Sequence, residues 1–194
     1  MNKNTTEPSS TAQLSEPDRS VGSIEVEYLQ RRRGFGLAWE QSTGMESRSV
    51  LLADAAATQD LGRQLAQQWL ALPPVERPIL LLQGDLGAGK TCLTQGLAAG
   101  LGIDEPITSP TFALAQHYTG RAGALVHLDL YRLEHPVAAD ELFAQEEEEA
   151  LALNALMAVE WAERLSFVPE GAWRVGLELL DPDEPDAGRR AWLR

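Results

Sequence analysis

PILLLQGDLGAGKT, residues 78–91, is the stretch that decides the fold of this chain. An apolar run ends at Gln83, and the eight residues from Gly84 to Thr91 match the pattern G-x-x-x-x-G-K-[ST] at every position. A continuous apolar run of this length is typical of a strand buried on both faces of an α/β sheet. The glycines let the backbone turn so that its N–H groups converge, and a following helix would direct its positive end at the same point. The segment therefore predicts a strand, a phosphate-binding loop and a helix in succession.

Lys90 and Thr91 carry the chemistry expected of such a loop. The Lys90 ammonium would reach the β- and γ-phosphates of a nucleoside triphosphate, and the Thr91 hydroxyl would ligate Mg²⁺. Lys3 is the only other lysine, so an Asn-Lys-x-Asp guanine reader cannot be present and adenine is the expected base. We therefore expect ATP or ADP with Mg²⁺ as ligands. The expected nucleotide-binding residues of the loop are Asp85, Gly87, Ala88, Gly89, Lys90, Thr91 and Cys92.

The sequence around the loop alternates between strand and helix patterns. Asp54 is a predicted helix cap, and Leu61, Leu65 and Trp69 recur at the spacing of a buried helix face. Alternation of this kind indicates an α/β layered domain of the P-loop NTPase type, with a mixed central sheet and flanking helices. We expect this domain to span residues 49–194. The predicted strands cover residues 49–52, 78–83, 111–118, 124–130, 157–159, 174–180 and 190–193, and the predicted helices cover residues 55–71, 90–99 and 139–153.

The first 48 residues have a different composition. Residues 2–20 are rich in Ser, Thr, Asn, Glu and Pro and offer little to bury, which predicts a disordered N-terminal extension over residues 1–48. The extension contains an arginine triplet at residues 31–33. A solvated tail is the favoured interpretation of that triplet, and a local contact with RNA or an acidic protein is the alternative.

Composition and charge exclude several classes of protein. The chain of 194 residues has 16 basic and 29 acidic side chains, a net charge of −13 that opposes broad contact with DNA, RNA or an anionic membrane. Its single cysteine, Cys92, excludes an internal disulfide framework and a cysteine-rich zinc site. No apolar run approaches the roughly 20 residues of a membrane span, and the first 20 residues have no apolar signal segment. These features predict a cytoplasmic protein without membrane or DNA partners.

Five motifs occur in a fixed order along the chain. They are LQGDLGAGKT at 82–91, the glycines at 96, 100 and 102, SPTF at 109–112, HLDLYRL at 127–133 and EWAER at 160–164. Together they resemble the TsaE (YjeE) family, the ATPase component of bacterial tRNA threonylcarbamoyladenosine biosynthesis. The resemblance covers residues 49–194.

Asp129 and Glu160 are the carboxylates that a phosphate-loop enzyme requires. Each lies at or near the end of a predicted apolar strand, where α/β sheets place their ligands, and at least one acid must hold Mg²⁺ or orient water. A solvated strand-end acid is the alternative for either residue. The resemblance implies that Glu160 binds Mg²⁺ with Thr91 and that Asp129 acts on the nucleotide or the attacking water. Lys90, Asp129 and Glu160 are then the expected catalytic residues.

The resemblance also implies that Arg189, in the last hairpin, approaches the nucleotide; a solvated hairpin arginine is the equal alternative. Residues 109–111 either close over the γ-phosphate as a switch segment or form a plain turn before a strand. His127 faces the same side of its strand as Asp129, and a packed histidine is favoured over a catalytic one. Trp161 packs against the loop or meets a partner. The family usually has a glycine after a Glu-Leu pair in the next segment, but here Glu141 and Leu142 are followed by Phe143 and the glutamate run at 146–149, which leaves the path of residues 139–155 open.

Three functions remain as hypotheses. The resemblance implies a Mg²⁺-dependent ATPase, weak alone, that works with a TsaD–TsaB complex after another enzyme has made threonylcarbamoyl-adenylate. ATP binding or hydrolysis would reset that complex between rounds of modification at adenosine 37 of tRNA, which this chain would contact only indirectly. The alternatives are a free-standing small-molecule kinase that uses the same loop, and a nucleotide-sensing module without a catalytic role.

Overall fold

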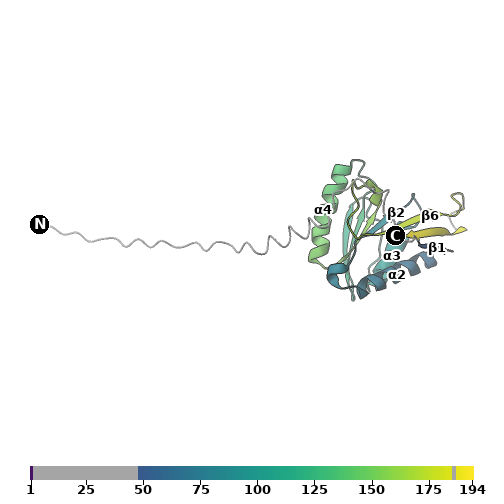
Figure 1. Ribbon diagram of the computed structural model, residues 1–194, viewed down its shortest axis with the longest axis horizontal. Coiled ribbons are helices and arrows are strands. Elements are labelled where there is room, and N and C mark those ends of the chain that lie inside the picture. The colour runs from purple at the N-terminus through teal and green to yellow at the C-terminus, as the bar shows by residue number, and fades with distance from the viewer. Residues whose placement is uncertain (2–47, 185–186) are drawn as a thin grey trace.

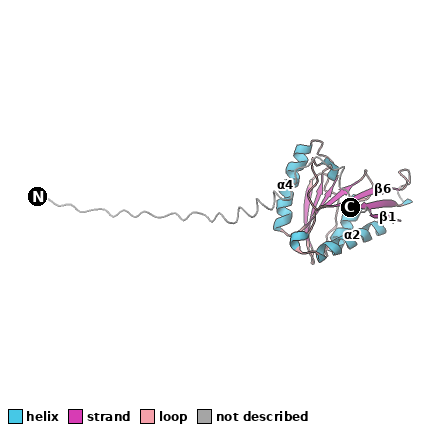
Figure 2. Ribbon diagram, in the orientation of Figure 1, coloured by secondary structure: helices cyan, strands magenta, loops and turns pink. Residues whose placement is uncertain are grey.

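The computed structural model describes Met1, residues 48–184 and residues 187–194, and the described chain forms a mixed sheet of seven strands. The strand order is β1-β7-β6-β2-β5-β4-β3. Figure 1 shows helices α2 and α3 on one side of this sheet and α4 on the other, and Figure 2 shows the strands lying between them. The predicted disordered extension and its arginine triplet lie outside the described residues, apart from Met1 and Arg48.

The central strands are parallel and the outer ones antiparallel. β2 pairs in parallel with β5 and β6, and β4 with β5, whereas β3, β7 and β1 join in antiparallel fashion. The predicted mixed sheet is therefore confirmed. The strands are β1 (Arg48–Leu52), β2 (Leu80–Gln83), β3 (Ala115–Thr119), β4 (Ala124–Asp129), β5 (Leu156–Glu160), β6 (Trp173–Leu179) and β7 (Arg189–Leu193). The helices are α2 (Ala55–Ala71), α3 (Lys90–Gly100) and α4 (Pro136–Ala152), with short 3₁₀ turns at Pro74–Glu76 and Ala162–Arg164.

α2 begins and ends as the sequence predicts. The Asp54 side chain accepts a hydrogen bond from the Ala57 amide at 2.7 Å, which satisfies one of the free N–H groups at the helix start. Leu61, Leu65 and Trp69 are all buried. The Trp69 indole N–H also donates to the Pro78 carbonyl at 2.9 Å, so the end of α2 is tied to the segment that leads into β2.

Two glycines bring α2 and α3 into backbone contact. A Cβ atom at Gly96 would lie 2.1 Å from the Gln59 carbonyl oxygen, and one at Gly62 would lie 2.2 Å from the Leu93 carbonyl oxygen. Both distances are far below van der Waals contact, so only glycine allows this approach. Because α3 begins at Lys90, the packing against α2 also fixes the position of the loop before it.

Alternation along the parallel strands separates two cores. Leu125 of β4 and Ala158 of β5 join the core under α2 and α3, whereas Val126 and Val159 join the core under α4. The same period of two places His127, Asp129 and Glu160 on the α3 side of the sheet. Along β4 and β5, the side chains on the face covered by α3 thus change from apolar to polar toward the strand ends, where the loop lies.

Two predicted elements differ from the structure. The strand expected over residues 111–118 begins only at Ala115, so that prediction is wrong for residues 111–114. This segment turns instead, with Leu114 at a φ of 66° and its amide bonded to the Pro110 carbonyl, because the Thr111 hydroxyl donates to Asp129 at the end of β4. The third helix begins at Pro136, three residues earlier than expected, since proline suits the first position of a helix. It continues without a break to Ala152, which establishes the path of most of residues 139–155. None of the described helices has the length and hydropathy of a membrane span.

Candidate functional site

The loop between β2 and α3 has a backbone that two glycines make possible. Gly84 and Gly89 have φ values of 135° and 108°, which L side chains rarely adopt. A Cβ atom at Gly84 would lie 2.2 Å from the Leu177 carbonyl oxygen of β6, and one at Gly89 would lie 2.4 Å from a guanidinium nitrogen of Arg189. Both glycines of the pattern therefore have a conformation that suits only glycine, and at Gly84 the backbone of β6 also leaves no space for a side chain.

Lys90 is buried at the base of this loop, with 4% of its surface exposed. Its Nζ atom donates to the carbonyl oxygens of Gly84 at 2.6 Å and Asp85 at 2.9 Å. The same atom lies 4.0 Å from the ring centroid of Trp161, a cation–π contact. Burial lowers the pKa of the Lys90 ammonium, and the nearby carboxylates, Glu160 first among them, oppose this shift. The lysine is thus held beside the loop backbone, where a phosphate group would replace the two carbonyls.

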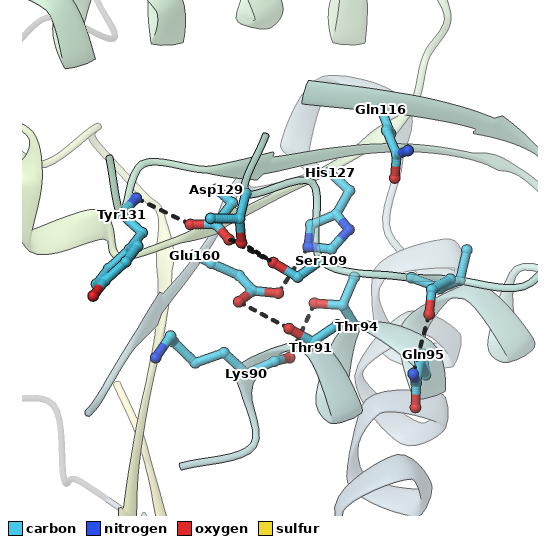
Figure 3. Close-up of polar contacts among 12 residues, drawn as sticks. Lys90, Thr91, Thr94, Gln95, Ser109, Gln116, His127, Asp129, Tyr131 and Glu160 are labelled. Atoms are coloured by element: carbon cyan, nitrogen blue, oxygen red, sulfur yellow. Dashed lines mark hydrogen bonds and ion pairs between the residues drawn. The ribbon is translucent and has the colours of Figure 1, made fainter. Parts of the chain in front are cut away.

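Glu160 ends β5 and points at the first turn of α3 (Figure 3). Only 2% of its surface is exposed. Its Oε2 atom accepts a hydrogen bond from the Thr91 hydroxyl at 3.1 Å, and its Oε1 atom lies 2.8 Å from Nε2 of His127. A hydroxyl and a carboxylate side by side are ligands that suit a hard cation such as Mg²⁺.

Asp129 ends β4 directly opposite Glu160 in the sheet register. Its Oδ2 atom accepts hydrogen bonds from the hydroxyls of Ser109 at 2.6 Å and Thr111 at 2.8 Å, and its Oδ1 atom accepts one from the Tyr131 amide at 3.0 Å. Asp129 is 2% exposed. Neither strand-end carboxylate is therefore a solvated acid, and the segment from Ser109 to Thr111 is bonded into the site rather than forming a plain turn before β3.

Arg189 begins β7 and lies against the loop. It is 9% exposed, its guanidinium faces Gly89, and its Nε atom is buried without a partner among the described residues. The solvated hairpin arginine is therefore excluded. The Cys92 thiol donates to the Ala55 carbonyl at 3.4 Å, and burial raises the pKa of this thiol against the opposing effect of Arg189. The side chain of Cys92 thus packs toward α2.

The predicted site residues meet at the carboxyl end of β2, β4 and β5, except that the Cys92 side chain is directed toward α2. The loop contributes Asp85 to Thr91, the strand ends contribute Asp129 and Glu160, and Arg189 lies across the loop. In residues 48–184 and 187–194 no group of three or more His, Cys, Asp or Glu side chains could hold a metal ion. The Thr91–Glu160 pair offers two oxygen ligands, so a cation bound there would take its other ligands from phosphate oxygens and water, which is how proteins usually bind Mg²⁺.

The sequence did not predict the contact of His127 with Glu160, and for Trp161 it left open packing against the loop, which the structure shows at Lys90. The alternation of His127 with Asp129 was a signal that both share a face, but the partner of His127 depends on the β4–β5 register. Trp161 reaches Lys90 because its backbone adopts a left-handed φ of 58°, for which the sequence has no signal. Its ring also lies 4.9 Å from that of Tyr131.

The fold and the site together define a P-loop NTPase-type domain: a buried strand, a glycine-rich loop and a helix, with two carboxylates on neighbouring strand ends. Within this class, the family model "Threonylcarbamoyl adenosine biosynthesis protein TsaE" matches residues 52–188. The chain therefore belongs to the TsaE family, as its motifs predicted.

Similar proteins agree with this assignment. The chain is 41% identical over 130 residues to a Nostoc protein named tRNA threonylcarbamoyladenosine biosynthesis protein TsaE, covering 67% of this chain and 77% of the relative. A Synechocystis protein of the same name is 48% identical over 126 residues, covering 63% and 75%. The crystal structure of YdiB from Bacillus subtilis superimposes with a TM-score of 0.55 at 25% identity, covering 78% of this chain and 87% of that one.

Proposed function

We propose that this protein is a Mg²⁺-dependent ATPase that acts in tRNA threonylcarbamoyladenosine biosynthesis, the process that appears in the names of its relatives. The observation that carries the proposal is the Thr91–Glu160 pair, 3.1 Å apart, beside the buried Lys90. Bound ATP with Mg²⁺ would supply the phosphoryl group and the cation that neutralises its charge. Thr91 and Glu160 would hold that cation, and Asp85, Gly87, Ala88, Gly89 and Cys92 would frame the phosphates with their backbones.

Lys90 has a separate task in this proposal. In this structure its ammonium is satisfied by two loop carbonyls, so it is already placed beside the loop. Exchange of those carbonyls for phosphate oxygens keeps the charge paired at each stage. The Arg189 guanidinium lies against Gly89, and its buried Nε has no partner among the described residues, so Arg189 can add a second positive charge to the same phosphates.

Asp129 is proposed to orient the attacking water. Its two oxygens already accept three hydrogen bonds, from Ser109, Thr111 and the Tyr131 amide. These bonds use three of the about four acceptor positions of a carboxylate, so one position remains for water. Movement of the Ser109–Thr111 segment would free two further positions on Asp129, which would make hydrolysis slow in the protein alone and faster with a partner that moves this segment.

The surface around the site supports a protein partner. Leu86 on the loop is 74% exposed, Phe112 beside Thr111 is 85% exposed and Tyr131 is 40% exposed. Exposed apolar side chains on segments that meet at the site favour burial against another protein. We propose a TsaD–TsaB-type complex as that partner, in the cytoplasm. Because the net charge of −13 opposes contact with a nucleic acid, we propose that the partner binds the tRNA. We propose neither DNA nor a membrane as a binding partner.

Two measurements test this function against its alternatives. Calorimetry of ADP and ATP with and without Mg²⁺ tests the site, and ATP turnover with and without the TsaD–TsaB complex tests the partner. We expect Mg²⁺-dependent binding and faster hydrolysis in the presence of the complex. ATP consumption that yields a phosphorylated small molecule, without any effect of the complex, would favour the kinase. Binding without hydrolysis in either condition would favour the sensing module.

A further inference from the structure

His127 is a buried polar side chain that the proposed reaction does not yet use. It lies in the middle of the central strand β4 with 0% of its surface exposed. Nε2 is its one bonded polar atom, at 2.8 Å from Oε1 of Glu160, and Nδ1 is buried without a partner among the described residues. Figure 3 shows the ring pointing from the strand into the site. A histidine needed only for packing would not require its single polar contact to be with this carboxylate.

The chemistry of the two groups fixes the direction of the hydrogen bond. An ionised carboxylate only accepts, so Nε2 must carry the hydrogen and donate it to Oε1. A hydrogen on Nδ1 would find no acceptor among the residues that the structure describes, and a buried unpaired donor is costly. The one N–H group of the neutral imidazole therefore donates to Glu160.

This contact divides the tasks of the two Glu160 oxygens. Oε1 is held by His127, which leaves Oε2 beside the Thr91 hydroxyl at 3.1 Å. Ala158 is the β5 residue opposite His127 in the register, and Glu160 follows it two residues later on the same face. Without the histidine, Oε1 would be a buried acceptor with no partner, and the carboxylate would be free to turn away from Thr91.

We propose that His127 is a positioning residue that orients Glu160 for the cation, an inference that rests on the proposed function. Groups that orient metal ligands through hydrogen bonds commonly change metal affinity about 10–100-fold when they are removed. His127 acts through Glu160 and does not touch the nucleotide. Its loss should therefore weaken the cation and leave nucleotide binding without metal unchanged.

A pair of amide variants separates the hydrogen bond from packing. In His127→Gln the side-chain amide reaches about as far as Nε2 and can still donate to Glu160, whereas in His127→Asn it reaches only about as far as Nδ1. His127→Leu removes all polar atoms at similar size. His117→Leu is the matched control, because it removes another histidine–carboxylate contact, the 2.5 Å pair with Glu146, away from the site.

The readouts are the affinity for ADP without metal, the apparent Mg²⁺ affinity of the ADP complex, and Mn²⁺ binding to the same complex by electron paramagnetic resonance. We expect about 10–100-fold weaker cation binding for His127→Leu and His127→Asn, with His127→Gln and His117→Leu within about threefold of wild type. ADP affinity without metal should be equal in all of them. Thermal unfolding establishes that each variant is folded, and the Gln–Asn comparison stands even if the Leu variant does not fold.

Three results would overturn this inference: wild-type cation affinity in His127→Asn, equal losses in the Gln and Asn variants, or a parallel loss of metal-free ADP binding. A wild-type protein whose ADP affinity is independent of Mg²⁺ and Mn²⁺ would instead refute the proposed function, and the inference with it. The two failures are therefore distinguishable.

Discussion

Substitution of Lys90 by methionine should weaken nucleotide binding strongly while the domain stays folded. Methionine keeps an unbranched apolar chain of similar length, so a sulfur–aromatic contact can replace the cation–π contact that Lys90 makes with the Trp161 ring. The variant removes the donor that contacts the Gly84 and Asp85 carbonyls in this structure at 2.6 and 2.9 Å. In the nucleotide complex the same donor would face the β- and γ-phosphates.

The size of the loss follows from one charge-assisted contact. A hydrogen bond to a charged group contributes about 1.5–3 kcal/mol. Since about 1.4 kcal/mol corresponds to a factor of ten, the dissociation constant for ATP should rise roughly 10–150-fold. The loss would exceed this range if the lysine contacts two phosphates at once.

Isothermal titration calorimetry with ATP and ADP measures this loss directly. Arg121→Met is the control, because it also removes one positive charge, from an 81% exposed side chain in the β3–β4 turn at the opposite end of the strand from Asp129. We expect the control to bind as wild type does. ATP binding by Lys90→Met within about threefold of wild type, far below the loss expected for a charged hydrogen bond, would refute the loop assignment.

Three further predictions test other parts of the structure. Gly96→Ala should destabilise the protein by about 1–3 kcal/mol or more, because its methyl group would lie 2.1 Å from the Gln59 carbonyl oxygen; an unchanged melting temperature would contradict the close packing of the helices. Asp129→Asn should lower partner-stimulated ATP hydrolysis by about 100-fold or more with little change in ADP affinity, and wild-type turnover would exclude its role toward water. Cys92 should react with iodoacetamide more slowly near pH 8 than an exposed peptide thiol does, because burial raises the pKa of its thiol and leaves less thiolate. The rate for Cys92 should still increase above pH 8. Equal rates for Cys92 and the peptide thiol near pH 8 would contradict the burial of Cys92.

Local signals were enough to predict much of the fold. The start of α2 could be predicted because the Asp54 cap bonds an amide only three residues away. The loop could be predicted because its own backbone conformation requires the glycines. Residues 111–114 could not, since the hydroxyl of Thr111 is drawn to Asp129, 18 positions away in the chain. A strand pattern contains no information on such a contact.

In the candidate site, too, some residues could be predicted from local sequence patterns and others depend on distant contacts. Asp129 and Glu160 were identified from their places at strand ends, which sequence patterns reveal. The contact of His127 with Glu160 depends on the pairing of β4 with β5, and the burial of Arg189 depends on where the last hairpin meets the loop. Both follow from tertiary packing, so the sequence could only leave their alternatives open.

The most direct test of the proposed function is the number of threonylcarbamoyladenosine residues formed per TsaD–TsaB complex in a reconstituted reaction with tRNA, threonylcarbamoyl-adenylate and ATP. With this protein present, each complex should complete many rounds. Without it, or with Glu160→Ala in its place, the reaction should stop after about one round, because the complex is not reset. Equal numbers of rounds with and without the protein would contradict the account.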